Sequence, residues 1–253
     1  MKTLRDSWLI FVRTLLSTLR NPVWIVIGLL QPVLYLALFG PLLRRVIAVQ
    51  GFPGGGAMNV FVPGLIVQMA LFGAAFVGFS LIAEIRWGFI ERLSVTPAGP
   101  LSILLGHAFR DVVALTIQAA VLIVAALPFG LSISLRGLAM LLVLIALLAF
   151  SMASFSYATA LKLKNEDAFA PFINTVAFLM MLLAGILLPM SLAPHWLKIV
   201  SKFDPLSYAV DASREMANEN LGASAVWIGL GVMASGCIVT AVWAARSFQN
   251  ATE

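Results

Sequence analysis

The sequence predicts an all-α integral membrane protein with six transmembrane helices, an N-terminal interfacial helix, a charged cytoplasmic helix and a re-entrant extracellular loop before the last span. Of its 253 residues, 61% are hydrophobic and only 11% are charged, and the mean hydropathy is +1.02. This composition is typical of multi-spanning membrane proteins and too apolar for a water-soluble domain of this size. We therefore expect a single transmembrane domain over residues 1–253.

Six apolar runs predict the spans. Each has more than about 20 residues, which at ~1.5 Å per residue is enough to cross a ~30 Å hydrocarbon core. They cover residues 22–43, 59–83, 107–129, 137–161, 168–190 and 221–245. Only residues 131–136 separate the third run from the fourth, so these two helices are expected to form a tight antiparallel pair. In the second run, Gly64, Gly73 and Gly78 offer small surfaces where neighbouring helices can approach closely.

The first 21 residues predict a helix that lies at the membrane surface. Apolar residues recur at steps of three or four between residues 4 and 19, and most charged side chains fall on the opposite side, which is the pattern of an amphipathic helix. The candidate interfacial residues are Trp8, at headgroup level, with Arg13 and Arg20. The segment has neither an apolar core region nor a small-residue cleavage site, so a signal peptide is not expected.

Near the interiors of the spans, we expect the polar side chains to be only uncharged amides and hydroxyls. They are Gln31, Gln68, Gln118, Ser154, Thr159 and Asn174, and we expect them to form hydrogen bonds between helices. An ion-coupled transporter usually places an ionisable residue inside the membrane. Energy for any transport is therefore expected to enter from outside the chain.

The region 84–106, between the second and third runs, carries charges that alternate in sign. Glu84, Arg86, Glu91 and Arg92 are followed by Thr96 and Pro97. A segment with these charges cannot lie in hydrocarbon, so we expect a short helix that projects into water and meets a partner. The alternative is a charged loop that serves only membrane topology. A second short charged turn follows at residues 162–167.

Residues 191–220, before the last run, are too long for a plain turn and too amphipathic for a linker. Trp196 and neighbouring apolar residues predict one short helix at the lipid interface, and Pro205 predicts the start of a second helix that returns. The candidate residues of this re-entrant region are Trp196, Pro205, Tyr208, Asp211 and Arg214.

Charge placement predicts the orientation. With the N-terminus inside, ten of the 16 Lys and Arg residues fall in cytoplasmic segments and six fall outside, so both termini and the charged region are expected in the cytoplasm. The basic residues are scattered, which does not favour a nucleic-acid partner. No Lys follows a Gly, so no phosphate-binding loop is expected. His107, His195 and the single Cys237 form no metal or catalytic motif, and we expect no catalytic, metal or cofactor site in this chain.

Four stretches together resemble a known family. They are RNP at 20–22 with QP at 31–32; VPG at 62–64 with LFGAA at 71–75; GFIERLSVTP at 88–97 with LG at 105–106; and PMSLAPHWL at 189–197 with DPLSYAVDASR at 204–214. The chain resembles the ABC-2 type exporter permeases, and within them the daunorubicin/doxorubicin resistance permease-like branch. The family often has Asn where this chain has Asp204, a change that keeps the capacity to start a helix.

The resemblance implies the permease subunit of an ATP-driven exporter. By that likeness, Glu84, Arg86, Glu91, Arg92, Thr96 and Pro97 belong to a coupling helix seated in a separate ABC ATPase. Two ATPase copies would bind ATP and Mg, and a second permease subunit, expected to be another copy of this chain, would complete the transporter. The expected location is the bacterial cell (inner) membrane, in contact with its lipids.

The cargo and the function class stay open. Apolar spans favour a lipophilic or amphipathic substrate such as a drug, whereas members of the resembled family also export polysaccharides, lipids and peptides. A membrane scaffold or assembly subunit without transport, and an autonomous ion-coupled transporter, are the competing classes.

Overall fold

The computed structural model describes residues 2–20, 23–46, 56–88, 100–186 and 193–252. Over these ranges all regular secondary structure is helical. The helices are α1 (Lys2–Arg20), α2 (Val23–Val46), α3 (Gly56–Ala75), α4 (Gly78–Arg86), α6 (Pro100–Ala126), the 3-10 turn η1 (Leu127–Phe129), α7 (Leu135–Leu163), α8 (Glu166–Leu183), α9 (His195–Ser201), α10 (Pro205–Ala217) and α11 (Ser224–Thr252). The predicted all-α fold class is confirmed for this part of the chain.

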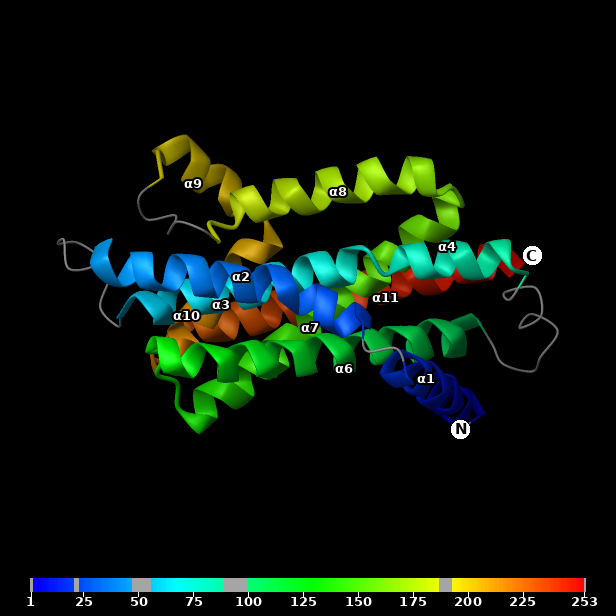
Figure 1. Cartoon of the computed structure of the whole chain (residues 1–253). Coiled ribbons are helices and arrows are strands. Elements are labelled where there is room, and N and C mark those ends of the chain that lie inside the picture. The colour runs from blue at the N-terminus through cyan, green and yellow to red at the C-terminus, as the bar shows by residue number, and fades with distance from the viewer. Residues whose placement is uncertain (1, 21–22, 47–55, 89–99, 187–192, 253) are drawn as a thin grey trace.

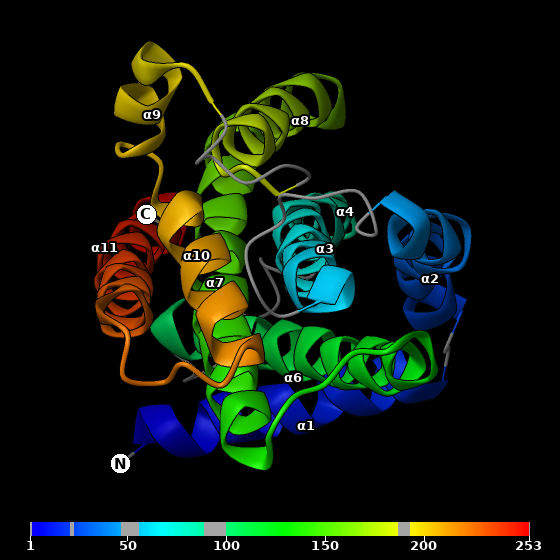
Figure 2. The same ribbon diagram turned by 90° about the vertical axis from the view of Figure 1, so that its left-hand side faces the viewer.

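Helix α7 is the centre of the bundle. It packs against α3, α4, α6, α8, α10 and α11, and Figure 2 shows these helices arranged around it. The long helices run side by side, and both termini lie at the same end of the bundle (Figure 1). Helix α1 is inclined to them and packs on α6. Helix α2 is at the edge, where it contacts α3 and α6.

Several helices are long and apolar enough to cross a membrane. Among the described residues these stretches are Met58–Arg86, Ser102–Phe129, Leu135–Leu163, Glu166–Leu183 and Ser224–Gln249, and a shorter apolar stretch, Val26–Pro41, lies in α2. The chain is therefore a multi-pass membrane protein. The predicted first span, residues 22–43, coincides with α2, and the total of six spans stays a prediction.

The second predicted span is broken between α3 and α4. Ser156 of α7 enters the break, where its hydroxyl accepts a hydrogen bond from Gly78 N at 2.9 Å and donates to Ala75 O. A side chain that inserts into the backbone ladder of a helix is a known cause of a kink. Because Ser156 satisfies both backbone groups, the break is tolerated inside a membrane-length segment. Helix α4 is thus a distinct short helix that follows α3.

The three glycines of this span lie where neighbours approach closely, as predicted. A β-carbon at Gly64 would lie 2.8 Å from Ile186 O, and one at Gly78 would lie 2.5 Å from Phe169 Cζ. At Gly73 the β-carbon would collide with Leu115 Cδ2. Each position lacks room for a larger side chain, so these glycines set the distances of α3 and α4 from α6, from α8 and from the segment that follows α8.

The α6–α7 turn follows the predicted antiparallel pair. Gly130 ends η1 in the left-handed conformation (φ 97°), which glycine adopts without steric cost. Ser134 then caps α7 by accepting a hydrogen bond from Gly137 N. The two helices pack against each other, which confirms the predicted pair.

The amides and hydroxyls that were predicted to form hydrogen bonds between helices lie in different settings. Thr159 Oγ1 donates to Phe155 O of its own helix, and Ser154 Oγ and Gln68 Oε1 have no partner among the described residues. Gln31 and Asn174 are exposed. Asn59 forms hydrogen bonds between distant segments, because its side-chain amide donates to Ser132 O at 2.9 Å and to Ala217 O at 3.1 Å.

Candidate functional site

The end of α4 carries two of the predicted coupling residues on opposite sides of the helix. Glu84 and Arg86 are two positions apart, which on an α-helix turns their side chains in nearly opposite directions. The Glu84 side chain is 20% exposed and its Oε2 lies 3.5 Å from His107 Nε2, a contact longer than an ordinary hydrogen bond. The expectation that the whole charged region projects into water is therefore wrong for Glu84. Its role in coupling stays a prediction.

Arg86 points outward and joins the second charged turn. Its Nη2 lies 3.1 Å from Glu166 Oε1, and the two side chains are 64% and 39% exposed. Glu166 is the first residue of α8, where Asn165 caps the helix by accepting a hydrogen bond from Asp167 N. The two charged turns of the sequence thus meet at one surface, a juxtaposition that their separation in the sequence does not predict.

A buried ionic cluster lies behind this surface, between α6 and α7. Arg110 contacts Asp111 Oδ1 through Nη2 at 2.7 Å and through Nε at 2.9 Å. Its Nη2 also donates to Tyr157 Oη at 3.2 Å, and the Tyr157 hydroxyl donates to Asp111 Oδ2. Asp111 is 6% exposed and Tyr157 is 1% exposed. A charge pair with these hydrogen bonds tolerates an apolar setting that would expel a lone charge.

This cluster corrects the expectation that the span interiors carry no charged residue. Arg110 and Asp111 lie within Ser102–Phe129, one of the membrane-length stretches, and the sequence showed them as adjacent charges inside the predicted third span. That pair in an apolar run was the available signal. Tyr157 and His107 carried no such signal, because their partners come from other helices. We call Glu84, His107, Arg110, Asp111 and Tyr157 the polar cluster.

Helix α1 reaches the same end of the bundle. Gly106 of α6 lies so close to α1 that a β-carbon there would be 2.5 Å from Ile10 Cγ2 and 3.2 Å from Ser7 O. Arg13, further along α1, is exposed. The predicted helix over the first 21 residues is thus in contact with the region that follows the second span. Its position at the membrane surface stays a prediction, with Trp8 63% exposed and Arg20 exposed.

The other predicted coupling residues, Glu91, Arg92, Thr96 and Pro97, lie outside the described residues. Helix α6 begins at Pro100, before the predicted start of the third span at residue 107. Within the described ranges, no three His, Cys, Asp or Glu side chains come together in a way that could hold a metal ion.

At the opposite end of the bundle, Arg214 of α10 forms an anchor. It is 9% exposed, and its guanidinium donates to Gly185 O at 2.8 Å, Ile186 O at 3.1 Å and Val60 O at 3.3 Å. Burial lowers the pKa of Arg214, and the negative charge of Asp211 opposes this shift. Carbonyl oxygens of the segment that follows α8 and of α3 thus accept from one side chain, which joins α10 to both.

The predicted helix start at Pro205 is confirmed. Asp204 Oδ1 accepts a hydrogen bond from Leu206 N at 3.0 Å, the geometry of an N-cap followed by proline at the first helical position. Tyr208 Oη donates to Lys202 O at 3.0 Å and holds α9 against α10. Trp196 is 65% exposed and Asp211 is exposed as well. Whether this region re-enters the membrane stays a prediction.

Comparisons with known proteins converge on one family. The family model described as ABC-2 type transporter matches residues 5–217. A putative transport permease ycf38 of Cyanophora paradoxa is 26% identical over 83% of this chain and 73% of its own length. The probable doxorubicin resistance ABC transporter permease protein DrrC of Mycobacterium tuberculosis is 25% identical over 95% and 87%. The daunorubicin resistance ABC transporter permease protein DrrB1 of Streptomyces coeruleorubidus is 22% identical over 98% and 86%.

Proposed function

We propose that this chain, which belongs to the ABC-2 type transporter family, exports a lipophilic or amphipathic cargo with energy supplied by a separate ATPase subunit. The family match over most of the chain carries the proposal. As a permease of an ABC transporter, the chain would supply the membrane path, and it would have no ATPase site of its own. ATP and Mg would bind to the partner.

The end of the bundle that holds α4, the start of α8 and both termini is the proposed entry point for energy. Arg86 and Glu166 offer an exposed charged surface there, suited to ion pairs across a subunit contact. Glu91, Arg92, Thr96 and Pro97 would extend this surface as the coupling helix. Two ATPase copies and a second copy of this chain would complete the transporter.

The polar cluster supports a route from that surface into the membrane. Helix α4 packs directly against α7, its Glu84 lies 3.5 Å from His107 of α6, and α6 is tied to α7 through Arg110, Asp111 and Tyr157. A push on α4 would therefore be felt in α7, which packs on most of the other helices. The break before α4 allows this helix to move as a unit on the end of α3.

A lipophilic cargo is favoured by the apolar spans and by the relatives whose names refer to daunorubicin and doxorubicin. Polysaccharide, lipid or peptide export uses the same machinery and stays the alternative. A bacterial cell membrane with cytoplasmic termini is part of the proposal, and the relatives from Mycobacterium tuberculosis and Streptomyces coeruleorubidus support it. A similar permease also occurs in Cyanophora paradoxa.

A membrane scaffold would use glycine-bearing spans for association between chains. Gly64, Gly73 and Gly78 face close neighbours within this chain instead, so these three glycines do not support that alternative. The polar cluster places charged residues inside a membrane-length stretch, which an autonomous ion-coupled transporter would need. However, Arg110 and Asp111 neutralise each other there.

Purification of the tagged chain from its native membrane in mild detergent tests the proposal. We expect an ABC ATPase to co-purify, and its ATP hydrolysis to change when the chain is removed. A chain that never associates with a nucleotide-binding subunit would contradict the proposal, and ATP-independent transport by the chain alone would favour the ion-coupled class.

A further inference from the structure

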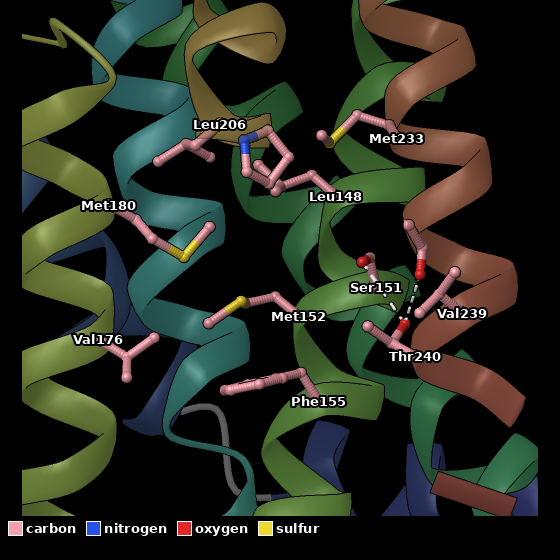
Figure 3. Close-up of a pocket in the computed structure, with 12 residues that line it drawn as sticks. Leu148, Ser151, Met152, Phe155, Val176, Met180, Leu206, Met233, Val239 and Thr240 are labelled. Carbon is pink, nitrogen blue, oxygen red and sulfur yellow. Dashed lines mark hydrogen bonds between the residues drawn. The ribbon is translucent and has the colours of Figure 1, made fainter. Parts of the chain in front are cut away.

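A cavity of about 250 Å³ lies between α7, α8, α10 and α11 (Figure 3). Met152 and Phe155 of α7 face it from the centre of the bundle, Met180 of α8 from one side and Met233 of α11 from the other. Leu206 of α10 closes one end. Because α7, α8 and α11 all contain membrane-length stretches, the cavity lies at the depth of the membrane and away from the polar cluster.

The lining is suited to an uncharged, flexible and apolar occupant. Among the described residues, no charged side chain lines the cavity. Of its two hydroxyls, Thr240 Oγ1 donates to Gly236 O at 2.8 Å, and Ser151 Oγ lies 3.5 Å from Thr240 Oγ1. A strongly polar or charged ligand would lose its hydration for very few partners there. Methionine side chains are flexible and polarisable, so they adapt to an occupant of variable shape.

The cavity opens to the outer surface of the bundle. Val239 lines it and is nevertheless 67% exposed, and α8 and α11 lie on either side of α7 (Figure 2). The surface around the opening is apolar, with Leu179 of α8 55% exposed and Ile238 of α11 68% exposed. In a membrane this surface meets lipid tails.

We propose that the cavity binds an acyl chain of a membrane phospholipid, which enters between α8 and α11. An apolar cavity of about 150 Å³ stays dry and takes up benzene, so a larger one that opens onto hydrocarbon is filled by the hydrocarbon itself. An occupying chain adds contacts to α8, most of whose membrane-length stretch is not buried in the protein. The site goes beyond the proposed export function and needs no ATPase.

Photolabelling of the full chain tests the proposal. The chain is reconstituted into vesicles of phosphatidylethanolamine and phosphatidylglycerol that contain a phosphatidylcholine with a diazirine on one acyl chain. After irradiation, mass spectrometry of peptides locates the adducts. We expect them to concentrate on the cavity-lining parts of α7 and α11, including Met152 and Met233.

Variants separate binding in the cavity from contact with bulk lipid. Val176→Phe fills the cavity from α8, and adducts at Met152 are expected to fall by about fivefold because the chain loses its apolar contacts. Phe178→Trp is the matched control, since Phe178 is 50% exposed and lies two positions from both Val176 and Met180, on the side of α8 away from the cavity lining, and it leaves the adducts unchanged. Val239→Phe fills the cavity from α11 and repeats the effect should Val176→Phe fail to fold.

Two results would overturn the proposal. One is an even spread of adducts over the outward residues of α8 and α11, with no change in Val176→Phe. The other is an efficient chain-to-chain crosslink through Val239→Cys in a Cys237→Ala background, because a second copy of the chain, not a lipid, would then cover the opening.

Discussion

Removal of the Tyr157 hydroxyl tests whether the polar cluster holds α6 to α7. Tyr157→Phe keeps the ring, which is 1% exposed, and deletes two interactions, the donation to Asp111 Oδ2 and the acceptance from Arg110 Nη2 at 3.2 Å. Hydrogen bonds to charged groups contribute about 1.5–3 kcal/mol each in soluble proteins, whereas bonds between membrane helices average about 0.6 kcal/mol. We expect a loss of about 2 kcal/mol in the free energy of unfolding.

The measurement is unfolding of the purified chain by SDS in mixed micelles, followed by circular dichroism. Tyr208→Phe is the matched control, because its hydroxyl makes one exposed bond to Lys202 O, and it should cost less than about 1 kcal/mol. Asp111→Asn should cost about 3–5 kcal/mol because it leaves the buried Arg110 charge without its counter-ion.

A double-mutant cycle decides whether the two side chains act together. The cost of Tyr157→Phe combined with Asp111→Asn should fall short of the sum of the single costs by about 1 kcal/mol or more. Additive costs, or a Tyr157→Phe cost no larger than that of Tyr208→Phe, would refute the cluster as a tie between α6 and α7.

Three further predictions concern the two ends of the bundle. Gly106→Ala should destabilise the chain by about 1–3 kcal/mol by forcing α1 away from α6, whereas Gly231→Ala, where a β-carbon meets open space, should be neutral or stabilising by up to about 1 kcal/mol; equal SDS midpoints for the two variants would contradict this. Arg86→Glu and Glu166→Arg should each lower stability by less than about 1 kcal/mol, and the exchanged pair should recover it; a double variant no better than either single one would argue against the ion pair. Burial raises the pKa of Asp204 from 3.8 to about 6, so the folded chain binds more protons than the unfolded chain and its stability falls as the pH rises from about 4 to 6; Asp204→Asn should flatten this fall in pH-dependent melting, and an unchanged slope would count against it.

Hydropathy was sufficient for most of the helices, because a membrane-length helix is specified by its own apolar residues. The start of α10 at Pro205 and the close approaches at Gly64, Gly73 and Gly78 also follow from local residue types. These features could be predicted because the residues that specify each helix or helix start lie within it or next to it, and because a close helix approach at a glycine depends only on the small size of that residue.

The break between α3 and α4 and the polar cluster depend on distant residues. Ser156 satisfies Ala75 and Gly78 from about 80 positions away, and nothing near residue 76 specifies a kink. Adjacent helix residues such as Arg110 and Asp111 do not face the same side, so their joint binding to Tyr157 could not be read from spacing. Glu84 was assigned to water from its neighbours in sequence, whereas in the fold α4 packs against α7 and Glu84 lies near His107 of α6.

The most direct test of the proposed function is export by the reconstituted transporter after charge reversal in the coupling region. Inverted vesicles that contain the chain and its co-purified ATPase are given ATP and doxorubicin as the amphipathic probe, and both ATP hydrolysis and uptake of the probe are recorded. We expect Glu91→Lys combined with Arg92→Glu to insert normally and to abolish ATP-driven uptake while hydrolysis continues. Uptake equal to that of the unmodified chain would contradict the assignment of this region as the route of energy into the membrane.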